Sequence, residues 1–208
     1  MDSGLRSGSE TKAETRGRQQ RKELLDEAGR MADLEFAVMS QEIRDGFERE
    51  EETIRKELSG IMKQIFQNYQ LMEQKGEVGR LRWIYFSFLR TSMMDDYPVY
   101  RIDFYDDSDC YSCQECCGNW DFSYVFSRFR SLKGKIRDIF LSQSKVKEYE
   151  MDDLLYGYYE KFHLLAAELL CELLQGTAFG YLKEGSSASI EIKEGELFDR
   201  TNTIKTIL

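Results

Sequence analysis

Four of the five cysteines in this 208-residue chain lie within the eight residues CYSCQECC. Cys110, Cys113 and Cys116 follow the spacing CxxCxxC, which allows three thiolates to face one metal ion or cluster. Cys117 directly follows Cys116, and neighbouring side chains usually point in different directions. The spacing therefore predicts a metal site with three ligands from this segment, and zinc or an iron–sulfur cluster would fit it.

The fourth ligand of such a site would be Cys117 or a residue from a remote part of the chain. The remote candidates are His163 and Cys171, which are about 12 Å apart along the last predicted helix, so one ion would take at most one of them. The sequence has no second pair of closely spaced cysteines or histidines, which structural zinc sites usually provide. Reversible thiol–disulfide chemistry and a purely structural cysteine-rich loop are therefore the alternatives to a metal site.

An acidic stretch leads directly into the cysteines and contains Asp103, Asp106, Asp107 and Asp109. It lacks the glycine and the closing glutamate of an EF-hand loop, so we expect a solvated turn rather than a calcium site. Nearby negative charge raises the pKa of a thiol and disfavours the thiolate form. The stretch thus argues against a reactive catalytic cysteine.

The sequence contains none of the common catalytic motifs: GxSxG, Walker A, GxGxxG and HExxH are all missing. A histidine base would have to be His163, the only histidine, which lies between Phe162 and Leu164 in a predicted helix. Catalysis by paired carboxylates leaves no local signature and stays open. We therefore expect a protein that is not an enzyme.

The longest predicted element is an amphipathic helix over about 32–75, followed by the helix-ending segment Gly76–Gly79. At 1.5 Å per residue it would be about 60 Å long, so we expect its N-terminal half to project from the body of the protein. Its stripe would pack on the core of this chain or on a partner helix. The apolar residues of the stripe are Ile43, Phe47, Ile54, Leu58, Ile61, Ile65, Tyr69 and Met72.

The remaining chain alternates between strand and helix patterns. Aromatic and β-branched residues predict strands in 81–90 and 99–105, and helical spacing predicts helices over 120–143 and 147–175. The tail from 178 to 198 reads as short hairpin strands. We therefore expect an α+β fold with a long N-terminal helix, two to three further helices and a small antiparallel sheet, within a single domain over 31–208. The polar residues 1–30 are expected to be a mostly disordered extension.

The net charge is −9, and one segment around the 120–143 helix is basic. We expect these cations to form a solvated face that pairs with the acidic helices of the same chain, and we expect no nucleic-acid binding by an acidic protein. No apolar run reaches the length of a secretory signal or a membrane span, which favours the cytoplasm and reduced thiols. The basic residues are Arg128, Arg130, Lys133, Lys135, Arg137, Lys145 and Lys147.

These observations favour a non-catalytic intracellular protein that acts through protein–protein contacts. The 32–75 helix would be the leading interface, either with another protein or in self-association. The alternative is a metal-binding or redox-responsive protein that uses the Cys110–Cys117 segment.

Overall fold

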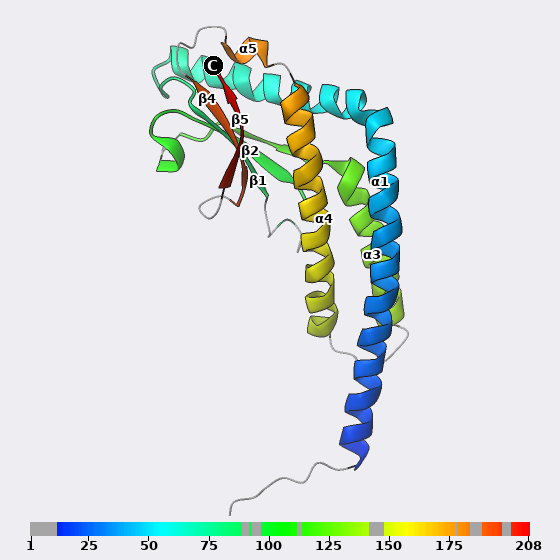
Figure 1. Cartoon of the computed structure of the whole chain (residues 1–208). Coiled ribbons are helices and arrows are strands. Elements are labelled where there is room, and N and C mark those ends of the chain that lie inside the picture. The colour runs from blue at the N-terminus through cyan, green and yellow to red at the C-terminus, as the bar shows by residue number, and fades with distance from the viewer. Residues whose placement is uncertain are drawn as a thin grey trace, which may run out of the picture.

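The computed structural model describes residues 12–88, 92, 97–111, 114–141, 148–177, 179–183, 189–196 and 201–208. It is an α+β fold in which three long helices form a column with a five-stranded sheet at one end (Figure 1). The helices are α1 (Lys12–Gln74), α3 (Ser123–Leu141) and α4 (Glu148–Gly176). The four-residue helix α5 (Gly180–Lys183) and the 3₁₀ turn η1 (Asp109–Tyr111) complete the helical elements named here.

Ion pairs between the long helices define their relative directions. As the residue number increases along α1, the residue number of its ion-pair partner increases in α4 and decreases in α3. Helix α1 therefore runs parallel to α4 and antiparallel to α3. Arg128 and Lys135 of the predicted basic segment pair with Glu42 and Glu35 of α1, as expected for these two cations. The pairs to α4 are Arg21–Glu150 at 3.1 Å, Asp33–Lys161 at 2.7 Å and Arg44–Glu168 at 2.6 Å, and those to α3 are Glu35–Lys135 at 2.7 Å and Glu42–Arg128 at 3.5 Å.

Helix α1 begins at Lys12, well before the predicted start near residue 32, and residues 12–30 are helical instead of disordered. Leu24, Ala28 and Ala32 continue the buried stripe toward the N-terminus. The Tyr158 hydroxyl donates a hydrogen bond of 2.8 Å to the Gly29 carbonyl, which ties this part of α1 to α4. The small side chains that allow this close contact carry little hydrophobic signal, so the sequence pattern missed them.

Helix α1 changes direction in its cyan part, near residue 50 (Figure 1). The Tyr124 hydroxyl of α3 donates a hydrogen bond of 2.6 Å to the Ile43 carbonyl, just before the bend. A side chain that enters the ladder of helical hydrogen bonds is a common cause of bending. Gly46 makes room for it, because a Cβ at this position would lie 2.7 Å from the Tyr124 hydroxyl oxygen.

The sheet has the strand order β3-β2-β1-β4-β5 and is mixed rather than wholly antiparallel. Strand β4 pairs in parallel with β1, and the other neighbours are antiparallel. The predicted 81–105 hairpin is confirmed as β1 and β2. The strands are β1 (Trp83–Phe88), β2 (Tyr100–Tyr105), β3 (Cys117–Trp120), β4 (Ile190–Gly195) and β5 (Thr201–Ile207).

The C-terminal part differs from the sequence prediction. The Ala178–Lys183 segment was expected to be a strand, but Gly180–Lys183 forms helix α5. Strand β4 confirms the predicted strand around Ile190, and β5 lies where no strand was expected. The expected strand at 197–198 and residue 178 lie outside the described residues.

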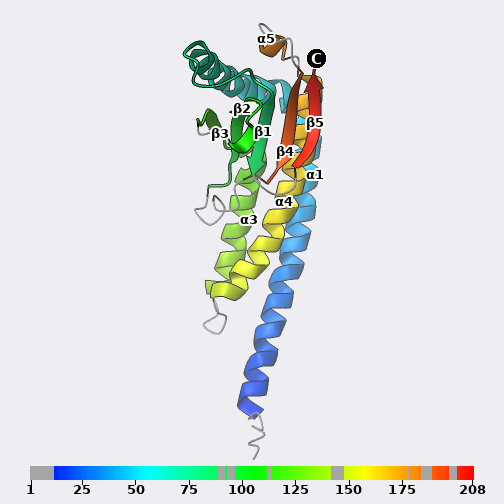
Figure 2. The same cartoon turned by 90° about the vertical axis from the view of Figure 1, so that its left-hand side faces the viewer.

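One face of the sheet packs on the helices and forms the main core. Phe88 of β1 stacks on Phe126 of α3 with 5.5 Å between ring centroids and lies 4.9 Å from the ring of Tyr159 in α4. The part of α1 beyond the bend covers the β2–β3 side, where Tyr69 packs against Phe104. In Figure 2, α3 and α4 lie behind the sheet, and η1 lies on the side of the sheet that faces the viewer. We call these the helix face and the open face of the sheet.

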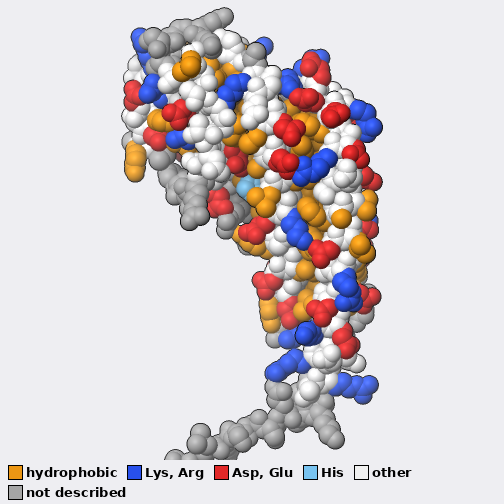
Figure 3. Space-filling model, viewed as in Figure 1, with side chains coloured by type: hydrophobic (Ala, Val, Ile, Leu, Met, Phe, Trp, Pro, Cys, Tyr) orange, Lys and Arg blue, Asp and Glu red, His pale blue; other side chains and the backbone are white. Residues whose placement is uncertain are grey.

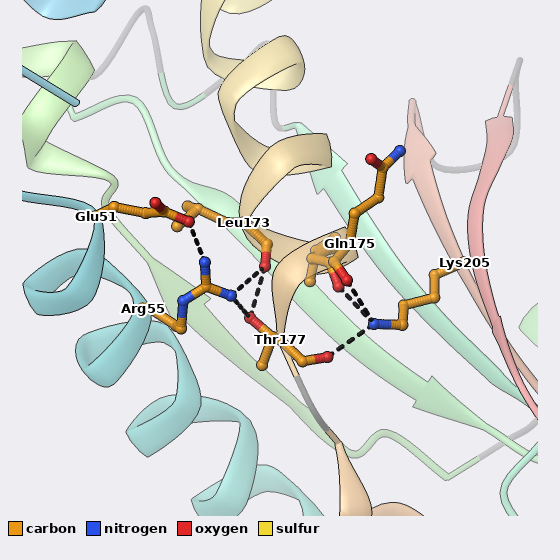
Figure 4. A network of polar contacts seen from close by, with 7 residues as sticks. Glu51, Arg55, Leu173, Gln175, Thr177 and Lys205 are labelled. Atoms are coloured by element: carbon orange, nitrogen blue, oxygen red, sulfur yellow. Dashed lines mark hydrogen bonds and ion pairs between the residues drawn. The ribbon is translucent and has the colours of Figure 1, made fainter. Parts of the chain in front are cut away.

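The C-terminus of α4 is held by cations from two other elements (Figure 4). Arg55 of α1 donates to the Leu173 carbonyl at 3.0 Å and to the Thr177 hydroxyl at 2.8 Å, and it pairs with Glu51. The last turn of α4 has no basic residue of its own. The second cation is Lys205 of β5, whose ammonium donates to the carbonyls of Leu174, Gln175 and Thr177 at 2.8, 3.1 and 2.7 Å.

Replacing Arg55 with methionine should lower the free energy of unfolding by about 2 kcal/mol, because the substitution removes charge-assisted bonds to the end of α4. Urea denaturation measures this loss. Lys56→Met is the matched control, since Lys56 is exposed and pairs with the exposed Glu52. It should change stability by less than about 0.5 kcal/mol. Equal losses in the two variants would contradict the capping role.

Candidate functional site

The cysteine segment begins on the open face of the sheet. The Tyr85 hydroxyl donates a hydrogen bond of 3.1 Å to Asp109 in η1, and Arg82 pairs with Asp107 at 3.0 Å. Asp106 accepts hydrogen bonds from the Gly79 and Ser108 amides at 2.7 and 2.8 Å. The acidic stretch therefore anchors the loop through protein contacts.

Cys116 points into the core and is only 5% exposed. Its thiol lies 3.5 Å from the Ile65 carbonyl of α1, to which it can donate a weak hydrogen bond. Burial, with smaller contributions from Cys117 and Asp103, raises the pKa of Cys116 to about 11. A thiol in this position is protonated at neutral pH and is a poor nucleophile.

Cys117 is exposed and begins β3, opposite Asp103 of β2. Cys116 and Cys117 therefore diverge, as the adjacency of the two residues predicted. Arg101 pairs with Asp103 at 2.9 Å and with Glu115 at 3.3 Å beside the thiol. The pKa of Cys117 is raised, chiefly by partial burial and also by the two carboxylates, while Arg101 acts in the opposite direction.

His163 and Cys171 lie on α4, which packs on the helix face. The His163 ring stacks on Phe88 with 4.1 Å between centroids, and its Nε2 is 3.3 Å from Oε1 of Glu194. Cys171 is close enough to Tyr100 to contribute to the raised pKa of that phenol. Cys116 instead lies beside Phe104, whose amide donates to its carbonyl. Tyr100 and Phe104 are four residues apart on β2, about 13 Å along the strand.

The structure therefore does not bring His163 or Cys171 to Cys116 or Cys117. Within the described residues, no three His, Cys, Asp or Glu side chains are arranged to hold a metal ion. The Cys110 side chain and all of Cys113 lie outside what the structure describes, so the metal site built on these two residues and Cys116 stays a prediction. Such a site would require the Cys116 thiol to turn away from the Ile65 carbonyl.

A buried polar cluster on the helix face was not predicted from the sequence. It consists of Tyr100, His163, Cys171 and Glu194, and the last of these is only 7% exposed. The Tyr100 hydroxyl, His163 Nε2 and Glu194 Oε1 are all buried without a well-aligned hydrogen bond. Ile190, Ile192 and Glu194 occupy every second position of the strand. This spacing could have revealed that the carboxylate shares the buried face of the two isoleucines.

A groove of about 850 Å³ lies between α1 and α3 at the bend of α1. Its walls carry both signs of charge and the hydroxyls of Ser123 and Ser127. The charged lining residues are Glu42, Asp45, Arg49, Glu50 and Arg128.

No protein family, curated protein or solved structure matches this chain. Among the described residues, no helix combines the length and apolar character that crossing a membrane requires.

The two described thiols of the loop should differ in reactivity. Cys117 should react with iodoacetamide in the native protein while Cys116 stays unmodified, because only Cys117 is exposed. The rate at Cys117 should rise with pH above neutrality, since its raised pKa keeps the thiol protonated. Peptide mass spectrometry after timed labelling measures both rates. Rapid modification of Cys116 in the folded protein would contradict its burial.

The contact between His163 and Glu194 should appear as coupling in a double-mutant cycle. Either His163→Leu or Glu194→Leu alone should cost about 1–3 kcal/mol, because each leaves a buried polar partner behind. The double variant should cost less than the sum of the two, as measured by thermal unfolding. Additive losses would show that the two side chains do not interact.

Proposed function

We propose that this protein is a non-catalytic cytoplasmic protein that acts through contacts with other proteins, and that the outer face of α1 is the leading contact surface. The observation that carries the proposal is a pair of large apolar side chains, Leu34 and Val38, which are 71% and 58% exposed. They lie one helical turn apart on the same side of α1, with the partly buried Met31 beside them. We define the outer face of α1 by the residues Glu27, Arg30, Met31, Leu34, Val38, Gln41 and Asp45.

The apolar stripe predicted for α1 is buried within this chain and is not available to a partner. Phe47, Ile54 and Leu58 are at most 5% exposed and belong to the core of this chain. Partner binding must therefore use another surface of the helix. The outer face lies away from that stripe, and apart from the partly buried Met31 its residues are exposed.

The N-terminal end of α1 also favours an interaction role. It extends beyond α3 and α4 (Figures 1 and 2), and residues 15–20 are exposed except for Gly17. A helical segment that buries little apolar surface is only marginally stable in water. A partner that packs against α1 would stabilise it.

The raised pKa values of the described thiols do not favour a catalytic role. Cys116 is protonated at neutral pH, and the pKa of both Cys117 and Cys171 is raised.

Figure 3 shows the column of helices covered by charged side chains of both signs with hydrophobic side chains between them. Leu34 and Val38 form a small apolar centre with polar residues around it, an arrangement that protein contacts share.

The double substitution Leu34→Glu and Val38→Glu should abolish the contacts of the protein without unfolding it. Both side chains are exposed, so the cost in stability should stay below about 1 kcal/mol. Circular dichroism confirms the fold, and quantitative affinity purification of tagged protein from its own cells measures the partners retained.

The matched control is Leu71→Glu with Leu164→Glu, because these two leucines are 55% and 68% exposed elsewhere on the helices. A partner that is lost from the first variant and kept by the control supports the proposal. If the first variant retained every partner of the wild type, the outer face of α1 would not be the contact surface.

A further inference from the structure

We infer that the contact between His163 and Glu194 is a pH-dependent latch, which holds β4 to α4 more firmly at mildly acidic pH than above neutrality. The inference goes beyond the proposed function and does not use the outer face of α1. It depends on a buried carboxylate whose ion-pair partner, within the described residues, is a histidine. Histidine is the side chain whose charge ordinarily changes between about pH 5 and pH 8.

The carboxylate of the latch is buried on the helix face of the sheet. Glu194 shares this face with Ile190 and Ile192, and its side chain is 9% exposed. Its Oε1 lies 3.3 Å from Nε2 of His163, and both atoms are buried without another hydrogen-bond partner among the described residues. A carboxylate taken out of water is costly unless a positive charge balances it. The protonated imidazole is the group that lies in position to do so.

The other titratable groups that face the latch from β2 and α4 are neutral near pH 7. Burial, and then the charge of Glu194, raises the pKa of Tyr100 well above its ordinary value. The same two causes, in the same order, raise the pKa of Cys171. Tyr159 of α4 also lies near Tyr100, and an ordinary phenol is neutral at about pH 7. None of these three groups supplies a charge that could replace the imidazolium.

The remaining elements around the latch add no group that titrates near neutral pH in the described structure. Phe88 of β1 stacks on the imidazole with 4.1 Å between centroids, Phe126 of α3 packs on Tyr100, and β5 places Asn202 beside the carboxylate. Two more carboxylates flank the latch, Glu160 one turn earlier on α4 and Glu196 beyond the end of β4, and both are less buried. Ordinary carboxylates stay ionised between about pH 5.5 and pH 8. We therefore assign the pH response to the imidazole.

The direction of the response follows from the charges of the pair. The side chain of His163 is 20% exposed, so it can exchange protons with water. While the imidazole is protonated, it attracts the carboxylate across the short contact in a poorly solvated place. As the pH rises through about 6–7, where an ordinary imidazole loses its proton, the carboxylate stays buried without a positive partner. The latch is therefore strongest at mildly acidic pH and weakens above neutrality.

The strands that respond are those at the C-terminal end of the chain. Strand β4 pairs with β1 on one side and with β5 on the other. The latch joins β4 to the middle of α4, and Lys205 joins β5 to the end of the same helix. A weaker latch should therefore loosen β4 and β5, whereas the hairpin of β1 and β2 does not depend on it.

Thermal unfolding of the full chain at about pH 5.5 and about pH 8 tests the latch. Glu194→Gln keeps the shape of the side chain and removes its charge. The loss of melting temperature that it causes should be at least about 3 °C larger at the lower pH, because only there does it remove an attraction between opposite charges. An equal loss at both pH values would overturn the inference.

Glu191→Gln is the matched control, because it makes the same change on the same strand but on the opposite face of the sheet. Its effect on the melting temperature should agree at the two pH values within about 1 °C. In a His163→Gln background, the effect of Glu194→Gln should also lose its pH dependence. A pH dependence that persists there would assign the response to another group and overturn the latch. If His163→Gln does not fold, the comparison of Glu194→Gln with Glu191→Gln still decides.

Hydrogen exchange followed by mass spectrometry tests where the response occurs. After correction for the intrinsic rates, peptides from β4 and β5 of the wild type should exchange at least about threefold faster at pH 8 than at pH 5.5, relative to peptides from β1 and β2. Glu194→Gln should remove this difference. Equal changes in all four strands would contradict a latch that acts on β4.

Discussion

The end of α4 is the point on which the arrangement of this protein depends. Several carbonyls at its C-terminus lack partners within the helix, and no cation of its own lies in the last turn. Arg55 and Lys205 supply the missing donors from α1 and β5. Because the two cations belong to elements far apart in sequence, satisfying one helix end fixes both the path of α1 beyond its bend and the position of the last strand.

The sheet then separates the chemistry of the chain into two layers. The loop that contains the cysteines starts on the open face, with Asp109 bonded to Tyr85 and Cys117 beside Arg101. His163 and Cys171 lie with α4 on the helix face. Side chains that a sequence pattern could combine into one metal site are thus placed apart, and the polar group that forms instead joins His163 to Glu194 of β4.

Helix α1 uses two of its faces in different ways. One carries the long buried stripe and holds the column of helices together, from Leu24 to Tyr69. The other carries the exposed Leu34 and Val38 between polar residues. The proposed contact surface uses this second face. The function proposed here follows from this division.

Much of the architecture was determined by the sequence itself, because it follows from the local periodicity of apolar side chains. The stripes of the long helices, the hairpin of β1 and β2, and the divergence of Cys116 from Cys117 all follow from the spacing of side chains along one element. The early start of α1 was missed because Ala28 and Ala32, although fully buried, carry little hydrophobic signal. Only the tertiary structure decided that β4 pairs with β1, that Glu194 meets His163 and that two distant cations cap α4. Each of these contacts joins residues about 30 to 120 positions apart, and no local pattern records such a pairing.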